Sequence, residues 1–174
     1  MAKDIETAFA EYAEDDVHCY IDAERKRTFT MLIREAVATH TRLGEVLSSA
    51  EWINHGGSPF KTSIKVISPH RLSNPFDKPD DDKIRGGVEA DRYGAARHYH
   101  IRENTYSPFG LHPTTNPTTK WKRIARETEF GRQKILHVFE PIDDGQTRGT
   151  NQFMSVMARL KMLDKFQATQ LQNA

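Results

Sequence analysis

Apolar residues recur at helical intervals in the first quarter of the chain. Three of them share one face of a predicted short helix that ends by Asp15: Ile5, Phe9 and Tyr12. A second helix is predicted to begin after Thr28, a residue type that often caps helix N-termini. It ends before Gly44, where a glycine with a left-handed backbone is common. The residues expected on its packing side are Phe29, Leu32, Ile33, Ala36, Val37 and His40.

The middle of the chain is divided into short runs rich in apolar and β-branched residues, which predict strands. The predicted strands cover residues 45–54, 62–68, 87–90, 95–102, 124–128 and 134–140. Residues 91–94 are typical of a hairpin turn, with Gly94 supplying a positive φ. Polar residues and prolines predict loops at 74–82 and 104–119.

The end of the chain predicts a long helix. Residues 146–149 are expected to form a tight turn that starts a helix over 150–172, capped by Thr150 or Asn151. We expect Arg148 to bond nearby carbonyl groups or a neighbouring subunit, with no catalytic role. One side of the helix carries an apolar stripe: Phe153, Met157, Leu160 and Leu163.

Helices at both ends with strands between them favour an α+β fold in one domain over residues 1–174. We predict a mixed, largely antiparallel sheet flanked by helices, with a long C-terminal helix. The helix that begins after Thr28 is expected to pack over one sheet that contains residues 64–68, 87–102 and 134–140.

Composition narrows the class of protein. The chain has 174 residues and is 37% hydrophobic, enough for a modest core. Its net charge of +1 gives no general attraction for nucleic acid or an anionic membrane. Cys19 is the single cysteine, which excludes an intrachain disulfide and favours a reducing cytoplasm. The sequence contains no apolar stretch of the roughly 20 residues that a membrane helix needs.

Charge is nevertheless uneven along the chain. Residues 1–24 hold eight acidic residues and one basic residue, Lys3. Residues 120–134 form a basic segment with Trp121 and Phe130 interleaved, a pattern that can contact phosphates. The same alternation also fits an ordinary solvated strand face. The basic residues of the segment are Lys120, Lys122, Arg123, Arg126, Arg132 and Lys134.

His98 and His100 are the residues most suggestive of metal chemistry. Alternation along a strand places both imidazoles on one face, which is half of a metal site. A small metal-dependent hydrolase using His98 and His100 is therefore one alternative function, and a nucleic-acid-binding module over the segment from Lys120 to Lys134 is another. A polar strand face is the simpler interpretation of the two histidines. The candidates for a third ligand are His137, Asp91 and Glu89.

The remaining candidates favour structural roles. The acidic run 80–82 lacks the spacing of a calcium-binding loop, and we interpret it as a solvated loop. Cys19 next to His18 is expected to be a small apolar filler, because adjacent side chains on an extended segment point in opposite directions. The residues alone therefore predict no catalytic group, no cofactor and no metal.

One ordered set of motifs resembles a known family. The segment 135–149, ILHVFEPIDDGQTRG, is similar to lambda-type bacteriophage portal proteins, in which a strand ending in HVFE leads to GQxRG and a long helix. Other similar blocks follow the family's order, with departures at Leu43 and Ser68. Together the similar blocks extend over roughly residues 17–172. They are CYIDA at 19–23, LGE at 43–45, IKVISPHRLSNP at 64–75, GVEADRYG at 87–94 and HYHI at 98–101.

The resemblance implies a structural role and no enzyme activity. It implies that the chain is an internal piece, the wing-like body, of a longer subunit. Such subunits form a closed ring at one vertex of the virion head, after assembly in the host cytoplasm of the phage or prophage. The implied partners are other portal subunits, terminase, head-completion or tail proteins, and non-specific double-stranded DNA. Candidate assembly or DNA contacts are Lys120, Lys122, Arg123, Arg126 and Arg148.

The resemblance also bears on assembly. The piece alone is expected to be monomeric or weakly associated, because the stem and crown elements of the family's ring lie outside it. Met154 and Met162 lie beyond the apolar stripe of the terminal helix and are expected to meet such elements. The acidic N-terminal segment and the basic segment 120–134 offer two complementary surfaces for a heterologous interface.

Overall fold

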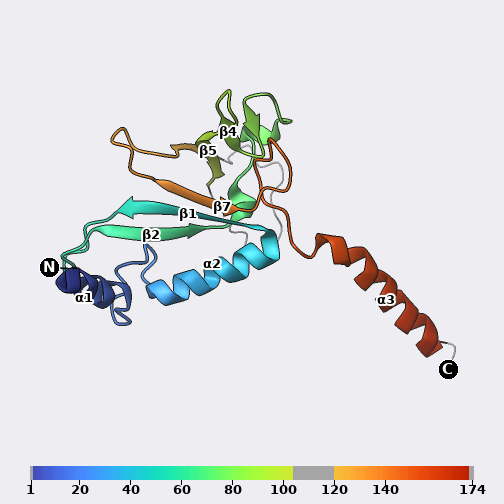
Figure 1. Cartoon of the computed structure of the whole chain (residues 1–174), viewed down its shortest axis with the longest axis horizontal. Helices are drawn as coiled ribbons and strands as arrows, with labels where there is room; N and C mark the ends of the chain where they lie inside the picture. The colour runs from blue at the N-terminus through green and yellow to red at the C-terminus, as the bar shows by residue number, and fades with distance from the viewer. Residues whose placement is uncertain (1, 104–119, 173–174) are drawn as a thin grey trace.

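The computed structural model describes residues 2–103 and 120–172, so the loop predicted at 104–119 lies outside the described residues. Helices near the two ends of the chain enclose a region of strands, which confirms the predicted α+β class (Figure 1). The described α-helices are α1 (Ala2–Ala13), α2 (Phe29–Leu43) and α3 (Met154–Gln172).

Within the described residues the strands form two antiparallel sheets, which corrects the prediction that one sheet holds them all. The first sheet has the order β2 (Thr62–Ile67), β1 (Glu45–Trp52) and β7 (Ile135–Phe139). The second has the order β3 (Ile84–Arg85), β4 (Val88–Ala90), β5 (Ala96–Arg102) and β6 (Trp121–Ala125). In the first sheet β1 is central, because its other edge pairs with a strand from near the end of the chain.

Helix α2 packs along β1 on one face of the first sheet, as predicted (Figure 1). Its packing side differs from the predicted one, because Ile33 and Val37 are 48% and 61% exposed, whereas the buried residues of the helix are Leu32 and Thr39. It begins after Thr28 and ends at Gly44, whose φ of 82° is the left-handed conformation expected for a C-terminal cap. Leu32 is 4% exposed and packs with Ala13 and Ile21 in a small cluster under α1 and α2.

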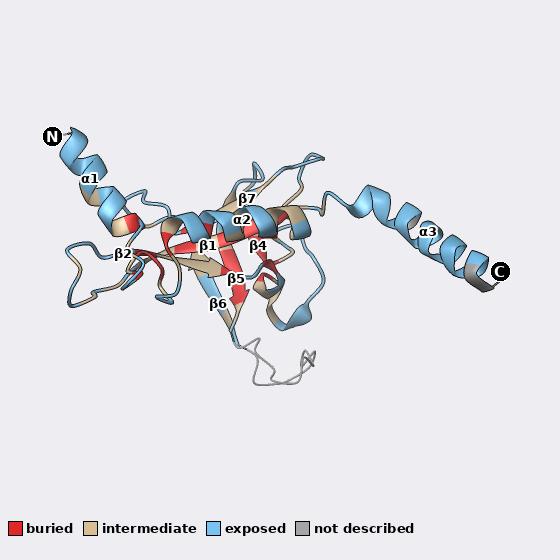
Figure 2. Cartoon of the chain, turned by 90° about the horizontal axis from the view of Figure 1, so that it is seen from below, coloured by how far each residue is buried: buried red, intermediate tan, exposed pale blue. Residues whose placement is uncertain are grey.

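The main core lies where the two sheets meet. It is built from buried side chains of both sheets and of the 3-10 turn η1 (Pro69–Arg71) and its flank. Burial of such apolar area is the dominant favourable contribution to folding. The residues are Leu47, Ile67, Leu72, Val88, Tyr99, Ile101 and Ile135, and Figure 2 shows this buried centre between exposed ends.

The hairpin between β4 and β5 forms as predicted. Gly94 has a φ of 84°, and the Asp91 carboxylate accepts the N–H groups of Tyr93 and Ala95 at 2.9 and 3.0 Å. Such local bonds from an aspartate favour a turn over a continuing strand.

The strand predicted at 124–128 is shifted toward the N-terminus and occupies Trp121–Ala125. The Trp121 indole donates to the Ser73 hydroxyl at 3.0 Å, and its ring packs against Phe76. Beyond β6 the chain reverses, because the Gly131 N–H donates to the Thr128 carbonyl and Gly131 has a φ of 76°. The Trp121 contacts hold the first residue of the strand in place, and the turn at 128–131 follows its end.

The start of the terminal helix also differs from the prediction. The turn lies at 143–146 instead of 146–149, with a 3.4 Å bond from the Gln146 N–H to the Asp143 carbonyl. The helix begins at Met154, three residues after Asn151, so neither Thr150 nor Asn151 directly flanks it as predicted. The Asn151 side chain accepts the Phe153 N–H at 2.8 Å within the turn that precedes the helix.

Helix α3 extends away from the body (Figures 1 and 2). The four residues of its predicted apolar stripe are about half exposed: Phe153 (49%), Met157 (51%), Leu160 (54%) and Leu163 (54%). The stripe is therefore not buried against the rest of the described chain. None of the described helices is long and apolar enough to cross a membrane.

Candidate functional site

The most densely bonded polar group in the described chain is the side chain of Arg148. Its guanidinium donates to three backbone carbonyls, those of Leu72 at 2.7 Å, Gly86 at 2.8 Å and Pro69 at 3.0 Å. It also donates to both oxygens of the Glu45 carboxylate, with Nε at 2.9 Å from each. A planar guanidinium with five N–H donors suits such a set of acceptors. The predicted bonding of Arg148 to nearby carbonyls is confirmed.

Glu45, the first residue of β1, is the second half of this arrangement. Its side chain is 5% exposed and accepts the Gly149 N–H at 2.9 Å, and His137 Nε2 lies 3.0 Å from it. Burial alone raises the pKa of this carboxyl. The bonds from His137, Arg148 and Gly149, together with the positive charge of Arg148, outweigh burial and lower the pKa to about 2.

The arrangement joins parts of the fold that are far apart in the sequence. Glu45 and His137 belong to the first sheet, Gly86 lies between β3 and β4 of the second, and Arg148 belongs to the segment leading to α3. We call the group formed by Glu45, His137 and Arg148 with the Pro69, Leu72 and Gly86 carbonyls the Arg148 clamp. It fixes both sheets and the terminal segment relative to one another.

Two glycines allow the backbone to pass beside the clamp. A Cβ on Gly149 would lie 2.1 Å from the Gly44 carbonyl oxygen, and one on Gly44 would lie 2.0 Å from the Thr150 carbonyl oxygen. Neither position has room for a side chain. Gln146 supports the same segment, because its amide donates to the Arg148 carbonyl at 2.6 Å and its side-chain oxygen accepts the Ile142 N–H at 2.8 Å.

His98 and His100 share one strand face, as predicted, and both contact Glu89. His98 Nδ1 lies 3.1 Å from one carboxylate oxygen and His100 Nε2 lies 2.6 Å from the other. Arg123 donates to both oxygens of Glu89, at 2.8 and 2.6 Å, and this bonding is the main reason that the pKa of Glu89 falls to about 2.

The guanidinium of Arg123 lies beside both the Glu89 carboxylate and His98. One of its nitrogens also lies 2.9 Å from His98 Nδ1. Among the described side chains, no group of three or more His, Cys, Asp or Glu residues is arranged to hold a metal ion. The geometry therefore gives no support to the metal-dependent hydrolase.

The other candidates for chemistry have local structural bonds. The Asp81 carboxylate accepts the N–H groups of Lys83 and Ile84 at 2.7 and 2.6 Å, and the Asp80 carboxylate accepts that of Gly86 at 2.9 Å. Cys19 is 7% exposed, and burial raises the pKa of its thiol, which disfavours the reactive thiolate.

The predicted basic contact residues do not act as one group in the structure. Lys120 and Lys122 are exposed, whereas Arg123 is bonded to Glu89 and Arg126 lies 3.7 Å from Glu127. The N–H groups of Arg148 are directed at partners within the chain. Contact of these residues with DNA or another subunit stays a prediction.

Sequence reasoning singled out Arg148 but missed Glu45 and the role of His137 beside it. A second buried carboxylate was missed as well: Asp22 is 0% exposed and accepts the Arg27 Nε–H at 2.9 Å. The signal for Glu45 was its place in the LGE block that resembles the portal family. The blocks that carry the resemblance meet at the clamp, since they contain Gly44, Glu45, Pro69, Leu72, His137, Arg148 and Gly149.

Fold and site together define a structural α+β body whose buried charges hold strands in place. The chain belongs to the lambda family of phage portal proteins, whose family model matches residues 1–174. It is similar to portal protein B of Escherichia phage lambda and to the portal protein of Escherichia phage N15. Each is 47% identical over all 174 residues of this chain. The chain spans 31% of the length of each relative.

Replacing Arg148 by Met is expected to lower the free energy of unfolding by about 3–5 kcal/mol, because Glu45 then stays buried without its partner. Urea unfolding followed by circular dichroism measures the change. The matched control is Arg159→Met on the exposed surface of α3, which we expect to change stability by about 0.5 kcal/mol or less. Equal midpoints for the two variants would show that the clamp contributes nothing.

Stability is expected to fall in acid because the folded-state pKa of Glu45 lies below its ordinary value. The stability from this group is complete above the ordinary value of 4.5 and is lost as the pH falls toward about 2. Urea midpoints at neutral pH and near pH ~3 measure the loss. Glu45→Gln, which has no titrating group at this position, should be less stable at neutral pH and lose less in acid. Parallel losses in the two proteins would contradict this assignment.

Proposed function

We propose that this chain is a structural segment of a phage portal subunit, part of a ring at one vertex of the virion head, and that it has no catalytic role. The observation that carries the proposal is the family match over residues 1–174. The 47% identity to two proteins named as portal proteins supports it over the same residues. The Arg148 clamp is consistent with this role, because it uses buried charges to fix the body's shape.

The proposed partners follow from this role. Copies of the subunit contact each other around the ring, terminase and head-completion or tail proteins dock on it, and double-stranded DNA passes it. The subunit is assembled in the host cytoplasm and ends in the virion. A ring requires two different complementary surfaces on each subunit. A body held by internal bonds keeps such surfaces at a constant angle.

A chimera tests the proposal. The matched segment of portal protein B of phage lambda is replaced by this chain, and the purified protein is examined by electron microscopy and analytical ultracentrifugation. We expect ring-shaped particles with a central channel and a single sedimenting species of the mass of the unmodified ring.

The unmodified lambda portal is the positive control, and the chimera with Arg148→Met is the negative control for a distorted body. A chimera that is folded by circular dichroism yet stays monomeric, while the unmodified portal forms rings, would argue against the proposed role.

Within the same proposal, Lys120 and Lys122 contact DNA phosphates. Both side chains are exposed, and Lys120 directly precedes β6, whose second residue is Lys122. In filter-binding assays the Lys120→Glu/Lys122→Glu variant should retain less DNA and reduce the salt slope by about 2. Lys3→Glu/Lys83→Glu makes the same charge change at two other exposed sites and serves as control. Equal losses in the two variants would show that only net charge matters.

A further inference from the structure

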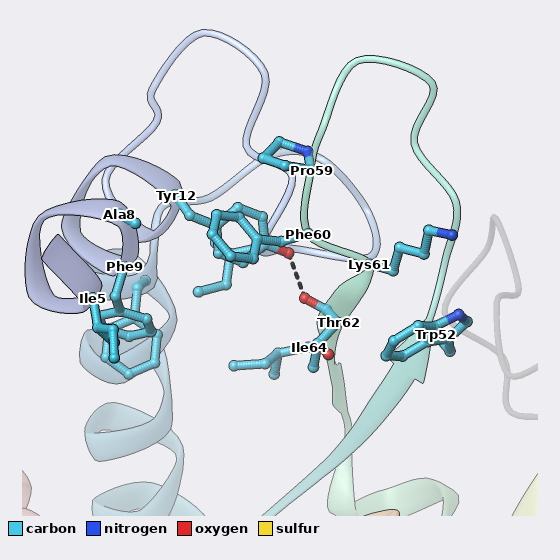
Figure 3. A pocket seen from close by; sticks show the side chains of 12 residues that line it. Ile5, Ala8, Phe9, Tyr12, Trp52, Pro59, Phe60, Lys61, Thr62 and Ile64 are labelled. Carbon is cyan, nitrogen blue, oxygen red and sulfur yellow. Dashed lines mark hydrogen bonds between the residues drawn. The ribbon is translucent and has the colours of Figure 1, made fainter. Parts of the chain in front are cut away.

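An apolar groove lies at the N-terminal end of the molecule, between α1 and the loop that joins β1 to β2. Its volume is about 650 Å³, and Ile5 and Phe9 of α1 face Trp52 and Phe60 across it (Figure 3). Ile5 is 66% exposed, Phe9 52% and Trp52 63%. Apolar surface of this extent, gathered in one concave site, is typical of an interaction site.

The groove has a fixed wall. The Tyr12 hydroxyl of α1 donates to the Thr62 carbonyl of β2, the bond drawn in Figure 3. The Tyr12 ring packs against Phe60 with 4.9 Å between ring centroids, and the Phe9 ring packs on Phe29 of α2 at 5.8 Å. Because these contacts hold α1 against both the sheet and α2, the groove is open before any partner binds.

At the opposite end of the molecule, α3 carries an apolar face without a cover in the described chain. Val156, Leu160 and Leu163 are spaced i, i+4 and i+7, which places them on one side of a helix. Their exposed fractions are 39%, 54% and 54%. Figure 2 shows the coloured part of α3 as exposed, extending from the body on the side away from α1.

The charges of the two helices are complementary. Helix α1 has three acidic residues and one basic residue, a net charge of −2, from Asp4, Glu6, Glu11 and Lys3. Helix α3 has three basic residues and one acidic residue, a net charge of +2, from Arg159, Lys161, Lys165 and Asp164. Opposite charges around an apolar contact favour the encounter and fix its orientation.

We propose that the apolar face of α3 from one copy of this chain docks in the groove between α1 and the β1–β2 loop of a second copy. The proposal rests on the proposed ring function and names the surfaces that meet. The contact is an apolar helix face inserted in a groove, a recurring mode of recognition. Since helix and groove lie at opposite ends of one chain, the contact is head-to-tail, and its repetition builds a ring where the rotation between copies closes.

Disulfide trapping tests the contact in the 174-residue chain at high concentration, with Cys19→Ala removing the native thiol. One variant carries Leu160→Cys on α3 and the other carries Ile5→Cys at the groove. After the two are mixed and oxidised, a non-reducing gel should show a cross-linked dimer. High salt should reduce its yield, because salt screens the attraction between the helices.

The matched control pairs Leu160→Cys with Tyr93→Cys, which is 79% exposed and lies in the β4–β5 hairpin outside the groove. The groove pair should cross-link severalfold faster than this control. Equal rates, or no dimer from the groove pair, would overturn the proposed contact.

A charge exchange gives a second readout. Arg159→Glu/Lys165→Glu on α3 should reduce trapping, and so should Glu6→Lys/Glu11→Lys on α1. The variant that carries all four changes should recover it, and failure to recover would argue against paired helices. The ring assay of the chimera separates the two proposals: rings that form with no trapped contact leave the portal function standing and refute this interface alone.

Discussion

The pairing of Arg148 with Glu45 is the interaction on which the arrangement of the two sheets depends. A buried ion pair is a weak source of net stability, because removing two charges from water costs about as much as their attraction returns. The ion pair matters because its loss would leave buried polar groups without hydrogen-bond partners. If the segment carrying Arg148 moved, the 5%-exposed Glu45 carboxylate and three backbone carbonyls would lose their main donor. Moving the sheets relative to each other would therefore cost free energy, although the ion pair itself adds little to the stability of the observed arrangement.

The close passage of the backbone beside the Arg148 clamp requires glycine at two positions of the family motifs, Gly44 and Gly149. Gly44 ends α2 with a left-handed backbone, and Glu45 follows it directly into the buried pair. Gly149 passes so close to Gly44 that a methyl group would overlap its carbonyl. The GQTRG segment thus supplies Arg148, the hydrogen-bond donor of the clamp. It also supplies Gly149, which is small enough for the chain to pass Gly44. At this motif two backbone segments cross, with Gly149 beside Gly44.

Local signals in the sequence were sufficient for elements whose causes are local. Thr28 and Gly44 bound α2, and Asp91 and Gly94 define a hairpin from bonds within five residues. The division into two sheets was not predictable in this way, because β1 pairs with a strand about ninety residues later in the chain. The start of β6 depends on the contacts of Trp121 with Ser73 and Phe76. Glu45 can be buried because Arg148, 103 residues later in the chain, donates hydrogen bonds to its carboxylate. No residue near Glu45 in the sequence indicates this partner.

The centre of the molecule and α3 differ in how far their apolar side chains are buried. In the centre, buried side chains and the clamp leave few polar groups without partners, whereas α3 exposes apolar side chains along a helix of 19 residues. In proteins most of the stability of a helix comes from packing of its apolar face. In the contact proposed above, a second copy that covers the apolar face of α3 would therefore stabilise the helix that it binds.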